Sequence, residues 1–233
     1  MGKSSIFLAT TILIGMLVLT IFVISSLPPL GRQPADANVN ADQVTPLDVP
    51  TVNFGDPIRG PQAAAVTIVE FGDFQCQPCA QLDLTLAKVL QDYPRDVRLV
   101  WKDFPDESLH KQAFAAAVAA RCAAAQGAFW EYHDALMADQ SSIDPNNFGV
   151  FAAQLGLDQT SFESCVQDQA TQPVVERDFE EGQRLRIDAT PYLFVNGRRV
   201  SGAVDYQFLH DVVAAELAKA ESAKPASPAP AAH

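Results

Sequence analysis

The fold is decided by the stretch Val66-Thr67-Ile68-Val69-Glu70-Phe71-Gly72-Asp73-Phe74-Gln75-Cys76-Gln77-Pro78-Cys79. It begins as a β-rich apolar run, breaks at Gly72 and ends in two cysteines, directly before a helical pattern. A thiolate at a helix N-terminus faces unpaired backbone N–H groups and the positive end of the helix dipole. Because both favour the charged sulfur, the pKa of such a cysteine can fall to roughly 3.5–7.5. The stretch therefore predicts a strand, a turn and a cysteine pair suited to thiol-disulfide exchange.

Length and composition allow one domain with an insertion or two small domains. The chain has 233 residues, and 48% of them are hydrophobic, which is enough for a core. The formal net charge is −12, and the 16 lysines and arginines form no basic cluster. A nucleic-acid partner is therefore excluded.

The N-terminal segment predicts a membrane anchor. Residues 6–27 form an uncharged, mostly apolar run of roughly 22 residues, long enough to cross a hydrocarbon core of ~30 Å as a helix. Signal-peptide apolar regions are shorter, about 7–15 residues, so an uncleaved transmembrane signal-anchor at 1–27 is favoured. The alternative is a cleaved signal peptide, because Ala35-Asp36-Ala37 has the small-residue pattern of a cleavage site.

Either interpretation of the N-terminus exports the rest of the chain. Lys3 stays inside, and the domain enters a compartment in which disulfides persist. We expect a single-pass protein of the bacterial inner (cell) membrane, with its catalytic domain on the extracytoplasmic or periplasmic side. Residues 28–50 are rich in Pro, Ala, Asp, Asn and Gln and predict a flexible linker between membrane and domain.

The remaining pattern predicts a sheet interrupted by helices. An edge strand is expected at 51–54, and the strand that starts at Val66 is followed by a helix and a second strand at 97–101. That spacing is typical of a βαβ unit with a parallel sheet. A hairpin around Asn196-Gly197 and a closing helix at 206–219 complete the pattern. The domain is expected at 51–220, and the Pro/Ala-rich tail at 221–233 is expected to be disordered.

Between the two halves of the sheet, residues 105–183 or so predict an alanine-rich helical insertion. Two helices are expected at 107–126 and 129–138. Three more are expected to begin near Asp144, Asp158 and Pro173, by cap or first-turn chemistry.

These features together resemble the thioredoxin-fold thiol-disulfide oxidoreductases of the DsbA type. The cysteine pair follows the first strand, a Thr190-Pro191 step precedes the hairpin, and a helical insertion lies between them. The resemblance covers residues 55–220 or so and is densest at 67–71, 103–105, 126–134 and 189–197. It implies an α/β thioredoxin fold with an inserted all-helical subdomain, here preceded by one N-terminal transmembrane helix.

The resemblance implies that Cys76 is the exposed nucleophile and Cys79 the more buried partner that resolves the mixed disulfide. Cys-x-x-Cys is also the spacing of half a zinc site, but a structural zinc site needs four ligands. Neither Cys122 nor Cys165 has a second Cys or a His at ligand spacing, so no metal is expected. Haem attachment is excluded because Ala80 stands where a histidine is required. No cofactor is expected.

The resemblance also assigns roles to three residues around the pair. Pro191 is expected to be a cis-proline that faces the active-site disulfide, with Thr190 offering backbone hydrogen bonds to a substrate strand. Glu70 is expected to be a buried acid with a raised pKa that relays a proton to or from Cys79. The alternative for Glu70 is a carboxylate at the sheet margin with no part in turnover.

The other two cysteines fall in the helical insertion. By the resemblance, Cys122 and Cys165 form a structural disulfide, as in DsbA-type relatives with extra cysteines, and the alternative is two buried free thiols. Four aromatic and imidazole side chains are expected to pack and to form hydrogen bonds rather than to catalyse: His110, His133, Trp101 and Trp130.

The chain departs from DsbA between the cysteines. DsbA carries Pro-His there, and the histidine stabilises its thiolate, whereas this chain has Gln77-Pro78. The resemblance implies disulfide exchange with exported, cysteine-containing proteins, and we favour an oxidase that a membrane or small-molecule redox partner reoxidises. The alternatives are a disulfide reductase or isomerase with the same site, and a thioredoxin-fold binding module without turnover.

Overall fold

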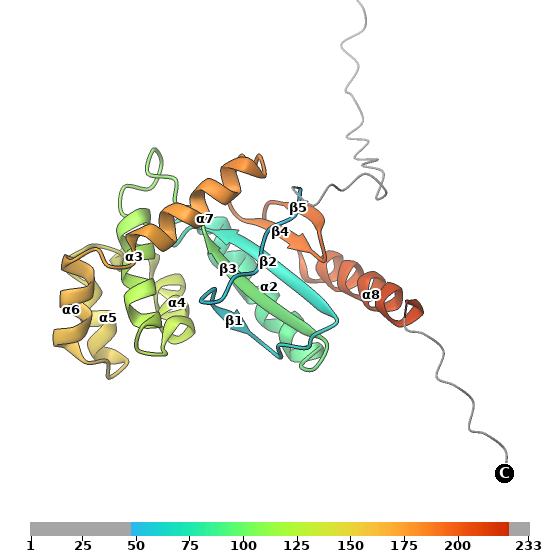
Figure 1. Ribbon diagram of the computed structural model, residues 1–233, viewed down its shortest axis with the longest axis horizontal. Coiled ribbons are helices and arrows are strands. Elements are labelled where there is room, and N and C mark those ends of the chain that lie inside the picture. Colours follow the sequence, from blue (N-terminus) through green and yellow to red (C-terminus); the bar gives the residue numbers. More distant parts are fainter. Residues whose placement is uncertain (1–47, 224–233) are drawn as a thin grey trace, which may run out of the picture. The chain divides into compact units, whose positions relative to one another are not determined.

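The computed structural model describes residues 48–223 (Figure 1). Within them the elements follow in this order: β1 (Ile58–Arg59), β2 (Val66–Gly72), α2 (Gln77–Asp92), β3 (Val97–Asp103), α3 (Ala113–Ala124), α4 (Phe129–Ala138), η2 (Gln140–Ser142), α5 (Phe148–Gln154), α6 (Gln159–Gln167), α7 (Gln172–Arg184), β4 (Tyr192–Val195), β5 (Arg198–Ser201) and α8 (Tyr206–Ser222).

The strands form one mixed sheet in the order β1-β3-β2-β4-β5. Strands β2 and β3 are parallel and are joined by α2, whereas β1, β4 and β5 pair antiparallel with their neighbours. The side chains of β2 and β3 are buried on both faces of the sheet, which explains why their sequences are apolar almost throughout. This is the thioredoxin-like α/β arrangement that the sequence predicted.

The two faces of the sheet have separate cores. Ile68 packs under Leu82 of α2 and Leu209 of α8 on one face. Phe71 lies on the opposite face, where it meets Phe104 and Phe194 edge to face. Successive residues of β2 therefore serve different layers, as the period of a strand requires. Glu70 shares the α2 face with Ile68.

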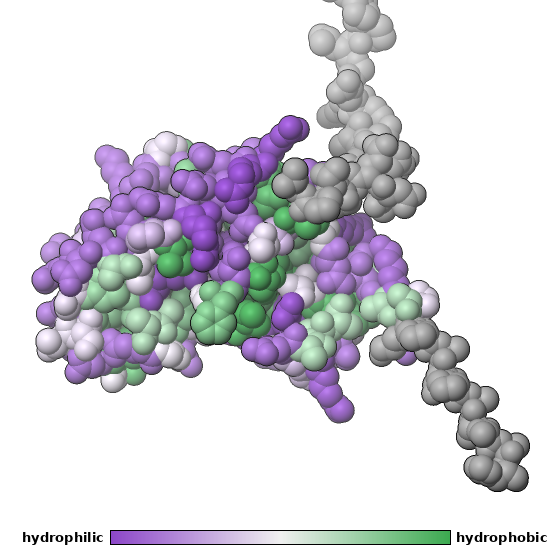
Figure 2. All heavy atoms as spheres, in the orientation of Figure 1, coloured by the Kyte–Doolittle hydropathy of each residue, from purple (hydrophilic) through white to green (hydrophobic). Residues whose placement is uncertain are grey.

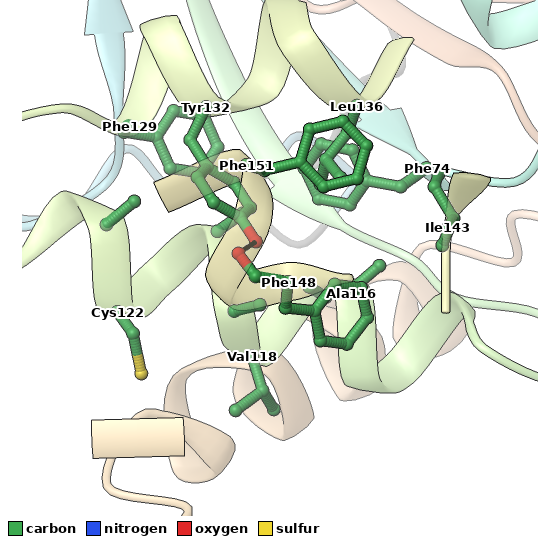
Figure 3. Close-up of a cluster of buried hydrophobic side chains, with 14 of the residues drawn as sticks. Phe74, Ala116, Val118, Cys122, Phe129, Tyr132, Leu136, Ile143, Phe148 and Phe151 are labelled. Carbon is green, nitrogen blue, oxygen red and sulfur yellow. Dashed lines mark hydrogen bonds between the residues drawn. The ribbon is translucent and has the colours of Figure 1, made fainter. Parts of the chain in front are cut away.

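Helices α3 to α6 gather at one end of the sheet, and α7 leads from them back along it (Figure 1). Their core contains Val118, Tyr132 and Phe148 from three helices, and the Tyr132 hydroxyl donates to the Phe148 carbonyl at 3.0 Å (Figure 3). Phe74, from the loop before Cys76, belongs to the same cluster. The helical block thus packs directly beneath the active-site loop.

A disulfide joins Cys122 of α3 to Cys165 of α6, which are 43 positions apart in sequence. It links two helices of the block that pack on each other. Cys122 is buried and Cys165 is half-buried.

A buried ionic network connects the sheet to the helical block. The Lys102 ammonium is 0% exposed and lies 2.8 Å from Asp56, 3.3 Å from Asp178 and 3.1 Å from Glu181. Arg121 of α3 extends the network to Asp103 and to Asp178. Three carboxylates around one ammonium compensate its desolvation, so the cluster is stable only while complete.

Two predicted elements are placed differently. No strand forms at 51–54, because the Asn53 N–H donates to the Asp56 carboxylate and turns the chain; the edge strand is β1, after the turn. The helix expected from 107 starts only at Ala113, because Asp106 instead accepts the N–H and hydroxyl of Ser108 in a local turn. Such side-chain to backbone bonds compete with helix formation.

The predicted signal-anchor at 1–27 lies outside the described residues, as do nearly all of the linker and all but the first residues of the tail. Among residues 48–223, no helix combines the length and the apolarity that crossing a membrane requires. The face seen in Figure 2 is largely hydrophilic, with an apolar area near β1. The turn before β1 carries Phe54, a fully exposed aromatic side chain.

Removing the disulfide should lower stability without removing activity. Replacing Cys122 and Cys165 with Ala frees a loop of 43 residues in the unfolded chain, which costs about 4 kcal/mol in the chain-entropy model. Thermal unfolding should give a lower Tm, while disulfide exchange by the folded variant persists. Activity lost with the fold intact would contradict a structural role.

Lys102→Met should destabilise the domain strongly. The change leaves Asp56, Asp178 and Glu181 without their shared cation, and breaking a buried ion pair costs about 3–5 kcal/mol. Urea unfolding measures the loss, with Lys111→Met, at an exposed lysine, as the control. Equal stability of the two variants would show that the network contributes nothing to folding.

Candidate active site

The site is built on the first turn of α2. Cys76 is the N-cap residue, with extended backbone angles, and its sulfur accepts the backbone N–H of Cys79 at 3.3 Å. Pro78 occupies the first turn, where a missing N–H costs nothing. The sulfur thus takes the place of the oxygen that usually caps a helix.

The surroundings of Cys76 favour its thiolate. A hydrogen bond from the Cys79 thiol, with further ones from Thr190 and the Cys79 N–H, lowers the pKa of Cys76 to about 7. Partial burial and the nearby Asp73 carboxylate oppose this lowering. A large fraction of Cys76 is therefore ionised at neutral pH.

Cys79 has the opposite character. It is 0% exposed, and burial, followed by its hydrogen bond to Cys76, raises its pKa far above the ordinary value. Both cysteines are free thiols in this structure. The pair therefore consists of one ionisable sulfur at the helix end and one protonated sulfur beneath it.

Cys76 is less exposed than expected. Only 3% of its surface is accessible, so the expectation of an exposed nucleophile is wrong for this conformation. The Thr190 carbonyl lies 3.4 Å from its sulfur, and the Gln140 side chain donates to the carbonyls of Phe74 and Cys76. Gln140 comes from η2, and nothing in its sequence context signals this contact.

The Thr190-Pro191 peptide bond is cis and leads directly into β4. Pro191 is buried and Thr190 half-buried, and β4 pairs with β2, which carries the cysteine loop. This pairing brings residues 114 positions apart, Cys76 and Thr190, into hydrogen-bond contact.

Glu70 lies in the middle of the sheet rather than at its margin. It is 2% exposed, and it pairs with Trp101 of β3 on one side and Leu193 of β4 on the other. Burial raises the pKa of Glu70 well above its ordinary value, and the charges of Asp83 and Cys76 raise it further. Burial therefore favours the protonated form of Glu70, which lies close enough to the cysteine pair for their charges to act on each other.

Asp73 anchors the loop in front of the pair. Its carboxylate, 0% exposed, accepts the N–H groups of Gln75 and Asp106 and lies 2.9 Å from His110 Nδ1. This contact gives His110 the hydrogen-bonding role that the sequence predicted. Two of the partners of Asp73, Asp106 and His110, lie 33 and 37 residues away, so no local pattern reveals these contacts.

The fold and the dithiol define a thioredoxin-like protein with two thiols of unequal acidity at a helix N-terminus. Residues 53–215 match the family model described as Thioredoxin. The chain belongs to this thioredoxin family. The match covers the sheet, the cysteine pair and the helical insertion.

Solved structures agree with the family. A thioredoxin-like oxidoreductase from Silicibacter pomeroyi is 26% identical, covers 74% of this chain and 95% of its own, and has a TM-score of 0.65. BdbD from Bacillus subtilis is 24% identical, over 70% of this chain and 94% of its own, with a TM-score of 0.65, and shows the shared fold. The thioredoxin fold that the resemblance to the DsbA type predicted is confirmed.

The curated relatives of this chain are much longer proteins that are named as antiporters. A Na(+)/H(+) antiporter NhaA 1 of Salinispora arenicola is 35% identical over 192 residues, which are 82% of this chain but 29% of the antiporter. A second, NhaA 3 of Salinispora tropica, is 36% identical over 77% of this chain and 28% of its own length. The chain thus spans less than a third of these relatives.

Alkylation should reveal the acidity of Cys76. The rate of reaction of the reduced protein with iodoacetamide should rise with pH around a midpoint near pH 7, since the pKa of Cys76 is about 7. Cys76→Ser should remove this phase, because Cys79 stays protonated. A midpoint at the ordinary cysteine value of about 8.5 would contradict the account of the helix end.

Glu70→Gln should stabilise the fold increasingly as pH rises. In the wild type the unfolded carboxyl ionises above about pH 4.3 while the buried one keeps its proton, so folding becomes less favourable. The free energy of unfolding falls by about 1.4 kcal/mol for each pH unit up to the pKa of Glu70 in the folded state. Glu70→Gln has no ionisable group at this position, so its stability does not fall in this way. Urea unfolding at pH 4 and pH 7 measures the difference, and equal stability at pH 7 would refute the raised pKa.

Proposed function

We propose that the protein exchanges disulfides with exported, cysteine-containing proteins through Cys76 and Cys79. The observation that carries the proposal is the unequal pair at the start of α2, where the pKa of Cys76 is lowered and that of Cys79 is raised. In the oxidised pair the sulfur of Cys76 can be attacked by a substrate thiolate. In the reduced pair Cys76 can exist as a thiolate while Cys79 remains a thiol. Such asymmetry is what stepwise thiol-disulfide exchange needs.

In the oxidising direction, a substrate thiolate attacks the sulfur of Cys76 in the Cys76–Cys79 disulfide. A bond forms between the substrate sulfur and Cys76, and the Cys76–Cys79 bond breaks. The electron pair leaves on Cys79, which takes a proton because its thiolate is strongly disfavoured by burial. Glu70 is the nearby acid that can donate this proton.

A second substrate thiolate then attacks the substrate sulfur of the mixed disulfide. The substrate disulfide forms, and Cys76 leaves as the thiolate that the N-terminus of α2 stabilises. The substrate loses two electrons and the protein's pair gains them. Thr190 and Pro191 are proposed to hold the substrate strand during both attacks, since the Thr190 carbonyl already borders the Cys76 sulfur.

The proposed setting is the extracytoplasmic side of a bacterial inner membrane, with residues 1–27 as the anchor and 28–50 as the linker. The disulfide between Cys122 and Cys165 supports a compartment in which disulfides persist. The relatives named as antiporters support proximity to a membrane. The direction proposed is oxidation of substrates, with a membrane or small-molecule oxidant that restores the disulfide.

A reductase with the same site is the second candidate. The pKa of Cys76, about 7, resembles the value of about 7 in thioredoxin more than the value of about 3.5 in DsbA. A Cys76 thiol with a higher pKa has a less stabilised thiolate. The reduced form of the pair is then less stable relative to the disulfide, which makes the pair less oxidising. Gln77-Pro78 in place of Pro-His between the cysteines agrees with this difference.

Two assays separate exchange from simple binding. The wild-type protein should accelerate the reduction of insulin by dithiothreitol, and Cys76→Ser should not. In a competent host, Cys79→Ser should accumulate mixed disulfides between Cys76 and exported proteins, because the resolving sulfur is missing. If the wild type and Cys76→Ser perform alike and no adducts form, the chain is a binding module.

The reduction potential of the pair, measured against glutathione buffers at pH 7, decides the direction. A value at or above about −180 mV, that of protein disulfide isomerase, supports the oxidase. A value near that of thioredoxin, roughly −270 mV, would rule out the oxidase and support the reductase.

A further inference from the structure

We propose that Gln140 is a positioning residue for disulfide exchange: its side-chain amide donates to the Cys76 carbonyl and so leaves the Cys79 N–H free to bind the Cys76 sulfur. The inference rests on the proposed function of the cysteine pair. It gives a part in the chemistry to a side chain of the helical block, outside the segments that carry the two cysteines and the cis-proline.

Gln140 holds the loop before the cysteine pair at two points. Its Nε2 lies 2.8 Å from the Phe74 carbonyl oxygen and 2.9 Å from that of Cys76. Carbonyl oxygens only accept hydrogen bonds, so the amide must present its NH2 group to them, and each of its two hydrogens then has one acceptor. The two partners are 66 and 64 positions away in sequence, so the contacts depend on how the helical block packs on the loop.

The backbone that carries Gln140 is fixed by the core of the helical block. Ile143, directly after η2, is buried in that core together with Phe74 of the loop (Figure 3). The turn of η2 is closed by the Ser142 N–H, which donates to the Asp139 carbonyl at 3.1 Å. The half-buried Gln140 side chain therefore reaches the loop from a rigid element.

The carbonyl and the sulfur of Cys76 compete for one donor. The Cys79 nitrogen lies 3.0 Å from the carbonyl oxygen and 3.3 Å from the sulfur. The same carbonyl also accepts the Ala80 N–H at 3.3 Å and the Gln140 amide at 2.9 Å. A carbonyl oxygen has two lone pairs, so Ala80 and Gln140 can satisfy it between them. The Cys79 N–H is then available to the sulfur, where it stabilises a thiolate.

The loop has further ties to the residues before α3, and these contact other groups. The Gln75 side chain accepts the Gln112 N–H at 2.7 Å, and the Asp73 carboxylate accepts the Asp106 N–H at 2.9 Å. Loss of the Gln140 amide should therefore alter Cys76 while the loop keeps its other attachments.

Gln140 is neutral, so its effect can be separated from that of charged groups. The titratable groups that act on Cys76 are Cys79 of α2, Asp73 of the loop and Glu70 of β2. A neutral substitution at position 140 leaves all three in place. A change in the acidity of Cys76 then reports the lost hydrogen bond.

The test compares Gln140→Met with Gln154→Met, the same change at an exposed position of α5. Methionine has nearly the length of glutamine but no N–H group. The reduced full-length proteins are treated with iodoacetamide from pH 5 to 9.5, and alkylation of Cys76 is followed by mass spectrometry. In Gln140→Met the midpoint should rise by about half a pH unit, with about threefold slower alkylation at pH 6 and an unchanged limiting rate at high pH.

Two further readouts separate this role from a merely structural one. Gln140→Glu, which has oxygens in place of donors and adds a negative charge, should raise the midpoint above that of Gln140→Met. The equilibrium of Gln140→Met with glutathione at pH 8 should shift about threefold toward the Cys76–Cys79 disulfide, because the Cys76 thiolate is less stabilised. Equal midpoints in Gln140→Met and Gln154→Met would overturn the inference, whatever the Tm of the two variants.

A measurement on the wild-type protein keeps the inference testable if Gln140→Met does not fold. In nitrogen-15 NMR spectra the two side-chain amide protons of Gln140 should exchange slowly with solvent. Their chemical shifts should follow the ionisation of Cys76, with a midpoint near pH 7. Rapid exchange of both protons, with shifts that stay constant between pH 6 and 8, would overturn the assignment.

Failure of the proposed function has a different signature. If the wild-type protein does not accelerate the reduction of insulin, disulfide exchange fails as the function, whatever the alkylation midpoints are. If the wild type exchanges disulfides and Gln140→Met has the midpoint of Gln154→Met, the role of Gln140 fails alone.

Discussion

The start of helix α2 is the constraint on which the rest of the site depends. Its first turn needs an N-cap acceptor, and the sulfur of Cys76 supplies it by accepting the Cys79 N–H. That contact fixes the sulfur at the positive end of the helix. The hydrogen bonds from the Cys79 thiol, from Thr190 and from this N–H together lower its pKa. The Asp73 anchor in front of the pair, and β4 behind it with Thr190, hold the turn in place.

The same sheet that positions the cysteine pair also buries two ionisable side chains, Glu70 and Lys102. Burial raises the pKa of Glu70 on the α2 face, and Lys102 is surrounded by three carboxylates on the other face. Burial of Glu70 favours its protonated form, whereas the charge of Lys102 is compensated by carboxylates and links β3 to α7. The imidazole of His133, on α4, packs against the rings of Trp101 and Trp130.

The parts of the fold that the sequence predicted are those with strong local signals. The apolar run before Gly72, the Asn196-Gly197 turn and the Asp158 cap each act over a few residues, and the structure has a strand, a hairpin and a helix there. The edge strand was misplaced because the Asn53–Asp56 contact outweighs weak strand propensity. The contacts of Asp73 with His110 and of Gln140 with Cys76 escaped prediction because these partners lie far away in sequence. His133 was predicted to pack, but its ring contact with Phe74 was not predicted, for the same reason.

The central claim, that Cys76 is an acidic thiol and Cys79 a protonated one, is tested most directly by the pH dependence of the pair's reduction potential. Below the pKa of Cys76, about 7, reduction takes up two protons and the potential should fall by about 59 mV per pH unit. Above it only Cys79 is protonated, and the slope should fall to about 30 mV. The predicted result is a single change in the slope of the potential against pH, near pH 7, in the wild type and in Glu70→Gln alike. A constant slope from pH 5 to 8 would contradict the account.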